Sequence, residues 1–263
     1  MELEINLNKS LEQNATAYFE KSKLMKKKYL GINKAIEFQN KKEQKKVILS
    51  NDIIKPKKKW FEKFRWFFSS DNFLVIGGKN AKMNEEIIKN YMKNEDVYFH
   101  AEVFGAPHCI IKTKDEKTNR IRVVPNSTMI EAAQFAITFS KAFESGQSTA
   151  DAYSVKPEQV SKRAPTGTSM GTGAFMIYGE RNWFKKTPIN VAIGFYQKEK
   201  KLMAGPVTAI KKNCIHVIKL NQGTIEKNVV AKTIFEKYSK KDLNVSNDEI
   251  LSLLPNGKFG IIE

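Results

Sequence analysis

Three short segments of this 263-residue sequence carry side chains whose types and spacing could do chemistry. The first is His100-Ala-Glu102, followed by Pro107 and Cys109, which is part of the pattern of a zinc-dependent nucleobase deaminase. That zinc site needs two cysteine thiolates two residues apart, and the other cysteine of the sequence, Cys214, is distant. We therefore interpret His100 as a half-buried or groove-facing side chain of an alternating strand. We predict no metal site and no cofactor.

The second segment is IGGKNAK, residues 76–82, where a strand-like run leads into a helix-like run. Adjacent glycines at such a junction can let backbone N–H groups face an anion, with lysines close by. The segment is not a P-loop, because neither GxxxxGKS nor GxxxxGKT is present. The alternative is a tight turn that needs a positive φ. The candidate anion-binding residues are Gly77, Gly78, Lys79, Asn80 and Lys82.

The third segment is SKRAPTGTSMGTG, residues 161–173, a run of small residues that begins with Lys162 and Arg163. Its hydroxyl and backbone donors could line a phosphate backbone, or it could be an ordinary Ω-loop. A separate run, residues 59–67, mixes aromatic and basic residues as stacking platforms for unpaired bases do. We expect most of these aromatic side chains to be core residues instead.

The sequence is strongly basic, with 45 Lys and Arg against 28 Asp and Glu and a formal net charge of +17. Residues 21–65 hold sixteen of the basic residues and four of the acidic ones, a net +12. Such a block favours a polyanionic partner, most often nucleic acid. The alternative is a lysine-rich background that keeps the protein in solution. No Ser/His/Asp, Cys/His or paired-carboxylate pattern supports catalysis, so we predict that the protein is not an enzyme.

The apolar pattern, the first ten residues and the cysteine count together predict the cellular location. No stretch approaches the ~20 apolar residues that a membrane helix needs, so we predict no membrane association. The first ten residues, MELEINLNKS, are acidic and polar and do not form a secretory signal. Two cysteines cannot make a disulfide scaffold, so a reducing cytoplasm is the expected location.

The elements that must position these segments predict an α+β fold in three parts. Residues 1–55 have a thin apolar seam that Gly31 and Asn33 interrupt, which predicts a short helical hairpin or one broken helix, a coiled-coil arm. Residues 56–199 predict a mixed or antiparallel sheet with packed helices, and residues 200–263 a small α/β domain. The predicted strands are residues 64–70, 73–78, 96–104, 107–113, 152–155, 174–179, 190–196 and 214–220, and the later helices are 81–92, 127–146, 224–240 and 246–254.

Four stretches together resemble the RNA-binding (NFACT-R) domain of the NFACT family. They are KKKWFEKFRWFFSSDNFLVIGGKNAKMNEEIIKNYM, DVYFHAEVFGAPHCIIK, STMIEAAQFA and VKPEQVSKRAPTGTSMGTGAFMIYGERNW, and the likeness spans residues 57–196. The family includes bacterial RqcH, the eukaryotic nuclear export mediator factor and archaeal relatives, and the sequence is most similar to the archaeal and eukaryotic branch. Residues 1–55 resemble the family's coiled-coil arm, and residues after 200 resemble its small C-terminal domain.

The resemblance implies a role in ribosome-associated quality control. Family members bind the large ribosomal subunit and tRNA during rescue of stalled ribosomes, and they act as scaffolds rather than catalysts. The resemblance therefore implies that this sequence is an RNA-binding subunit of such a factor. The alternative is a stand-alone nucleic-acid- or protein-binding module with no role in C-terminal tailing.

Matching the family's motifs adds further candidate RNA-binding residues, with roles in phosphate and ribose contacts. They are His100, Glu102, Gly105, Lys162, Arg163, Arg181 and Asn182. The sequence departs from the family's pattern at two places: Lys79-Asn80 stands where Arg-Asp is frequent, and Glu180 stands where Lys is common, which weakens one phosphate contact. The family's N-terminal domain has no counterpart in this sequence. We expect a separately encoded N-terminal half as partner; a reduced stand-alone protein is the alternative.

Overall fold

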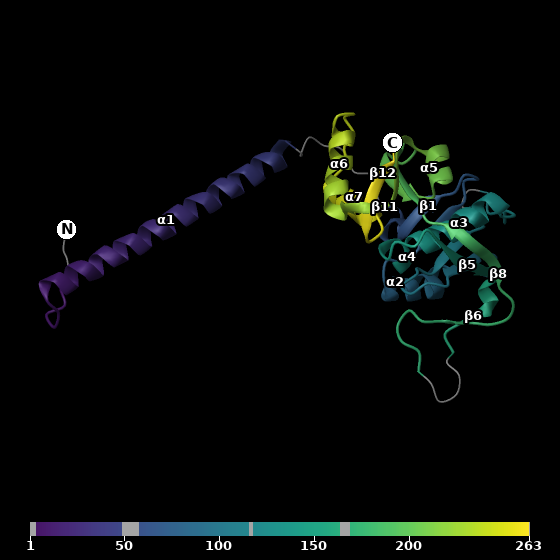
Figure 1. Cartoon of the computed structure of the whole chain (residues 1–263), viewed down its shortest axis with the longest axis horizontal. Coiled ribbons are helices and arrows are strands. Elements are labelled where there is room, and N and C mark those ends of the chain that lie inside the picture. The colour runs from purple at the N-terminus through teal and green to yellow at the C-terminus, as the bar shows by residue number, and fades with distance from the viewer. Residues whose placement is uncertain (1–3, 49–57, 116–117, 164–168, 263) are drawn as a thin grey trace. The chain divides into compact units, whose positions relative to one another are not determined.

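The computed structural model describes residues 4–48, 58–115, 118–163 and 169–262 (Figure 1). The chain divides into two compact units, Met1–Lys58 and Lys59–Glu263. Within the described residues, no helix is both long enough and apolar enough to cross a membrane.

The described part of the first unit contains one helix, α1 (Leu11–Ile48). Ser10 begins it with a capping box, because the Gln13 N–H donates to Oγ of Ser10 and the Ser10 N–H donates to the Gln13 side chain. Apolar side chains along its first two thirds are exposed: Leu11, Tyr18, Phe19, Leu24, Met25, Tyr29, Leu30 and Ile32.

The predicted hairpin is wrong, because α1 runs through Gly31 and Asn33 without a turn. A glycine inside a helix costs about 1 kcal/mol relative to alanine, which weakens a helix but does not end it. The 38-residue helix spans about 57 Å at 1.5 Å per residue, whereas either arm of a hairpin would be about half as long.

The second unit contains a six-stranded antiparallel sheet in the order β1-β2-β4-β3-β5-β8. Its strands are β1 (Arg65–Phe68), β2 (Leu74–Gly77), β3 (Val97–Ala101), β4 (Cys109–Lys112), β5 (Thr149–Val155) and β8 (Asn182–Pro188). The predicted hairpin over residues 64–78 is confirmed as β1 and β2. Asn72 supplies the positive φ, 61°, that their turn needs.

Helix α3 (Asn126–Thr138) contacts β3, β4, β5 and β8, and most of its apolar side chains are buried, although Ile130 is exposed. A short helix, α4 (Lys141–Glu144), follows it. Before the sheet comes the 3-10 turn η1 (Trp60–Lys63), and after β2 come α2 (Ala81–Glu86) and the π-helical turn η2 (Ile87–Tyr91). A turn, η3 (Pro157–Gln159), precedes the two-stranded sheet of β6 (Val160–Ser161) and β7 (Met176–Ile177).

A four-stranded antiparallel sheet completes this unit in the order β10-β9-β11-β12. Its strands are β9 (Val191–Tyr196), β10 (Lys201–Gly205), β11 (Ile215–Glu226) and β12 (Lys258–Ile262), and its helices are α5 (Val207–Asn213), α6 (Lys227–Ser239) and α7 (Asn247–Leu253). In Figure 1, α6 and α7 lie together beside β11 and β12.

Two features of this sheet differ from the prediction. The pairing is antiparallel, so this part is α+β and not α/β. Strand β9 precedes residue 200 but pairs with β10 and β11, so the predicted boundary at 199/200 cuts a hairpin. Hydrogen bonds also cross this predicted boundary. The side-chain amide of Asn213 donates to the carbonyl oxygens of Phe68 and Ser69 in partly buried contacts.

Candidate nucleic-acid interface

A row of ring-bearing side chains crosses the six-stranded sheet. Strand register pairs His100 of β3 with Tyr153 of β5, and Tyr153 with Trp183 of β8. His108, just before β4, extends the row on the other side. The ring centroids lie 4.5 Å apart for His108 and His100, 6.1 Å for His100 and Tyr153, and 5.3 Å for Tyr153 and Trp183. Three strands and the residue before β4 thus place these rings next to one another.

The alternation of strand side chains decides which residues share this face. Cys109 pairs with Phe99, so both point to the face opposite His100. Cys109 is fully buried, and burial raises the pKa of its thiol. His100 and Cys109 therefore cannot bind one metal ion, whatever their spacing in the sequence. Within the described residues, no group of three or more His, Cys, Asp or Glu could hold a metal.

Both histidines of the row are held neutral. Burial lowers the pKa of His108 to about 3 and also lowers the pKa of His100. Nδ1 of His100 lies 3.2 Å from the carbonyl oxygen of Pro107, which only accepts, so Nδ1 carries the proton and Nε2 is an acceptor. His108 donates to the backbone of Gly173, which leaves its Nδ1 to accept from the hydroxyl of Tyr98 at 2.6 Å.

The guanidinium of Arg181 lies over the rings at the Tyr153 and Trp183 end of the row. Its guanidinium carbon is 4.5 Å from the ring centroid of Tyr153 and 5.7 Å from that of Trp183. One of its nitrogens is 3.2 Å from a carboxylate oxygen of Glu102. Asn182 follows on β8, where its amide nitrogen lies 3.3 Å from Oγ of Ser154. The structure therefore brings His100, Glu102 and Arg181 together at this end of the row, whereas the register of Asn182 with Ser154 places Asn182 on the opposite face of the sheet.

Gly77 and Gly78 lie at the other end of the row, beside His108. The Gly78 N–H donates to the His108 carbonyl at 3.3 Å, and a Cβ on Gly78 would lie 1.9 Å from Oδ1 of Asn84. Neither Gly77 nor Gly78 has a positive φ, so close approach and not turn geometry requires glycine here. Asn80 begins α2 by accepting the Met83 N–H at 2.9 Å.

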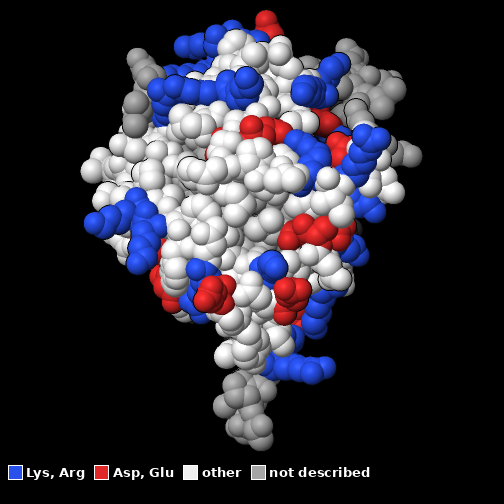
Figure 2. All heavy atoms as spheres, turned by 90° about the vertical axis from the view of Figure 1, so that its right-hand side faces the viewer, with Lys and Arg blue, Asp and Glu red and all other residues white. Residues whose placement is uncertain are grey.

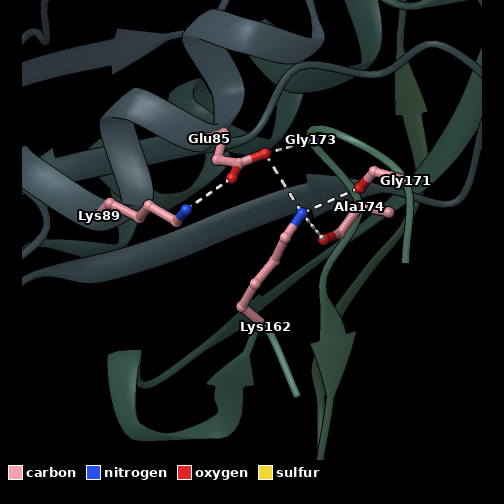
Figure 3. A network of polar contacts seen from close by, with 6 residues as sticks. All are labelled: Glu85, Lys89, Lys162, Gly171, Gly173 and Ala174. Carbon is pink, nitrogen blue, oxygen red and sulfur yellow. Dashed lines mark hydrogen bonds and ion pairs between the residues drawn. The ribbon is translucent and has the colours of Figure 1, made fainter. Parts of the chain in front are cut away.

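A carboxylate joins this end of the row to the small-residue segment (Figure 3). Glu85 of α2 accepts the Gly173 N–H at 3.0 Å and lies 3.2 Å from Nζ of Lys162. Nζ of Lys162 also donates to the carbonyls of Gly171 at 2.9 Å and Ala174 at 3.2 Å. Lys89 contacts the second oxygen of Glu85 at 2.7 Å. We call these contacts of Glu85 and Lys162 the Glu85 clip. Lys162 thus has a structural role within it.

The clip places residues 169–174 against the start of α2. A Cβ on Gly173, whose φ is +78°, would lie 2.6 Å from the carbonyl oxygen of Ala81. Phe175 then adds to the row, with its ring centroid 5.3 Å from that of His108 and 5.1 Å from Nζ of Lys162. Two predicted segments far apart in the sequence therefore lie on the same side of the sheet. Residues 164–168 of the predicted segment lie outside the described residues.

The remaining candidate residues lie on the surface around the row. Lys79, Lys82, Gly105 and Arg163 are exposed, and Gly105 has a φ of +71°. The aromatic residues of positions 60–67 are mostly core, as expected: Phe61, Phe64, Trp66 and Phe67 are buried. Sequence reasoning missed Tyr153 and Trp183. The pair Trp183-Phe184 in NWFKKTP, residues 182–188, was the available signal for this strand, because aromatic residues are enriched in strands.

The basic residues do not form one continuous patch on the face in Figure 2. Lys and Arg gather in several groups around a largely uncharged central area, and Asp and Glu lie among them (Figure 2). The block predicted from residues 21–65 is divided, because its first part lies on α1, residues 49–57 lie outside the described residues, and the rest begins the sheet. On this face, charge alone does not mark a single binding surface.

Comparison with known proteins connects this geometry to a family. Residues 63–179, which contain most of the row and the Glu85 clip, match the family described as the NFACT protein RNA binding domain. The protein named archaeal Rqc2 homolog aRqcH, from Methanocaldococcus jannaschii, is 37% identical over 212 residues, 80% of this chain and 30% of that protein. The human ribosome quality control complex subunit NEMF is 38% identical over 166 residues, 63% of this chain and 15% of that protein.

One solved structure is also similar to this chain, but more distantly. It is the C-terminal of the fibronectin/fibrinogen-binding protein from Streptococcus suis, with a TM-score of 0.38 and 19% identity over 68% of this chain and 77% of that chain. The chain spans about a third or less of the length of the relatives named above. Its matched domain and its identity to these relatives show that the chain belongs to the NFACT family.

Proposed function

We propose that this chain is an RNA-binding subunit of a cytoplasmic ribosome-associated quality control factor. It binds the large ribosomal subunit and tRNA during rescue of stalled ribosomes. It acts as a scaffold and catalyses no reaction of its own. Support comes from the matched RNA-binding domain and from relatives named as ribosome quality control subunits.

The observation that carries the proposal is the row of rings, with an exposed tryptophan at one end and basic residues at the other. An RNA strand needs stacking surfaces for bases and cationic or polar groups for its backbone. The row supplies the first through the exposed ring of Trp183, which packs on the buried Tyr153. Exposed Lys79, Lys82 and Arg163 supply the second. Backbone contacts of this kind orient RNA without reading its sequence.

Sedimentation tests the proposal directly. The purified chain is mixed with separated large and small ribosomal subunits and run on a sucrose gradient. We expect co-migration with large subunits, reduced for Arg181→Ala and retained for Lys232→Ala, which removes an exposed cation on α6. Migration with neither subunit would contradict the proposal and favour the stand-alone binding module.

Salt dependence gives a second test. If about six phosphates are engaged, affinity for tRNA should fall on the order of a thousandfold between ~50 and ~200 mM salt, because each contact releases condensed counterions. An affinity for tRNA that does not change with salt concentration would contradict the proposed phosphate contacts.

A further inference from the structure

The aromatic row ends at an exposed tryptophan. Trp183 lies on β8, at the edge of the six-stranded sheet, and is 40% exposed. The other tryptophans are covered: Trp66 is buried, and Trp60 stacks on Tyr91 with 4.7 Å between ring centroids and 3° between ring planes. Trp183 is therefore the tryptophan whose ring a ligand could reach most readily.

Arg181 extends this surface as a plane rather than as a free charge. Its guanidinium covers the Tyr153 ring on one side, and about a third of its side chain (32%) stays exposed. The carboxylate of Glu102 at 3.2 Å offsets its charge and would repel a phosphate placed there. A guanidinium with a neutralised charge and an accessible face suits stacking better than phosphate binding.

The neighbouring His100 adds an edge contact. It is half-buried and lies 6.1 Å, centroid to centroid, from Tyr153 at nearly a right angle. Its Nε2 is an acceptor, because Nδ1 donates to Pro107. An amino group on a base lying over Arg181 would find a neutral acceptor nearby and not a second cation.

We propose that Trp183 and Arg181 form a platform on which an unpaired RNA base stacks, so that the domain binds single-stranded RNA in preference to a duplex with the same number of phosphates. Bases inside a duplex already stack on each other and cannot offer a face to the platform. The inference rests on the proposed function, since it names the class of RNA that this same interface takes.

Intrinsic tryptophan fluorescence of the full chain tests the platform. The probes are a short single-stranded oligoadenylate and an RNA hairpin with equal numbers of phosphates. We expect the oligoadenylate to quench the wild-type protein and to bind tighter than the hairpin. Trp183→Phe should lose most of the quenching while keeping most of the affinity, and Trp60→Phe should keep both. Trp183→Ala should bind the oligoadenylate about 5- to 150-fold more weakly, the usual range for one stacked base.

The outcomes separate the platform from the proposed function. Unchanged oligoadenylate affinity in Trp183→Ala, or tighter binding of the hairpin by the wild type, overturns the platform. If the wild type still co-migrates with large ribosomal subunits in that case, the proposed function stands. If the wild type binds neither RNA nor subunits, both fail together.

Discussion

The carboxylate of Glu85 lies 3.2 Å from Nζ of Lys162, which is 77 residues further along the chain. The same carboxylate accepts the N–H of Gly173, so one side chain fixes both ends of the described part of the small-residue segment (Figure 3). This is how a segment without regular structure is held beside the aromatic row. From the sequence, Lys162 is a predicted phosphate contact. In the structure its ammonium group pairs with Glu85 instead.

Replacing Glu85 by glutamine should release this segment. Lys89, the Gly173 N–H and Lys162 lower the pKa of Glu85 to about 2 from its ordinary 4.5. Because the folded pKa is depressed, the stabilisation is fully present above pH 4.5 and is lost as the pH falls through about 2. We expect Glu85→Gln to be less stable than wild type in urea unfolding at pH 7, with a difference that narrows below pH 4.5. Glu180→Gln, at an exposed carboxyl, is the control.

Alanine at Gly173 should disturb the same contact from the backbone side. A Cβ there meets the carbonyl oxygen of Ala81 at 2.6 Å and imposes a positive φ on a residue that avoids it. We expect a loss of more than about 1 kcal/mol in unfolding free energy and weaker RNA binding. Gly171→Ala is the matched control, because no atom lies within 4 Å of its Cβ position and its φ is not positive. Equal effects from both substitutions would exclude this packing role.

The sequence predicted the elements whose pattern is local. The β1–β2 hairpin follows from two apolar runs around Ser-Asp-Asn. The helix predicted over residues 127–146 is confirmed in its first part as α3, but it ends at Thr138 and the short α4 follows it. Strand β8 was missed because its apolar residues, Trp183 and Phe184, are adjacent and are followed by the exposed Lys185 and Lys186, so this edge strand shows no regular alternation.

The candidate site was predicted in part, and the limit is physical. Residue types singled out His100 and the two glycines, and the family resemblance added Arg181. Strand register and packing bring His100 and Arg181 to one face. Nothing local distinguishes Glu85 from the other acids of a charged helix, because its partners are set by tertiary packing. Trp183 likewise becomes a candidate site residue only through its register with Tyr153, which places the two side chains next to each other.

The continuity of α1 gives a prediction at Gly31. Alanine there should stabilise the helix by about 1 kcal/mol, because glycine loses more backbone entropy and no atom lies within 4 Å of its Cβ position. Amide hydrogen exchange over residues 11–33 should slow accordingly. Ala15→Gly, at an exposed position of the same helix, should speed it by a similar factor. Faster exchange in Gly31→Ala would mean that the chain turns at Gly31 after all.

Buried, neutral histidines should make the stability of the domain depend on pH. The pKa of His108 is lowered by burial to about 3, whereas an unfolded histidine titrates near 6.5, so the unfolded chain binds more protons between these values. Stability from this group is therefore full above pH 6.5 and falls by up to about 1.4 kcal/mol per pH unit as the pH drops towards 3. His108→Asn keeps an acceptor for Tyr98 and removes the titration, so its urea midpoint should change less between pH 7 and pH 5. His216→Asn, at an exposed residue whose φ of 53° suits asparagine, should retain the wild-type slope. A His108→Asn profile parallel to wild type would show that His108 is not the titrating group.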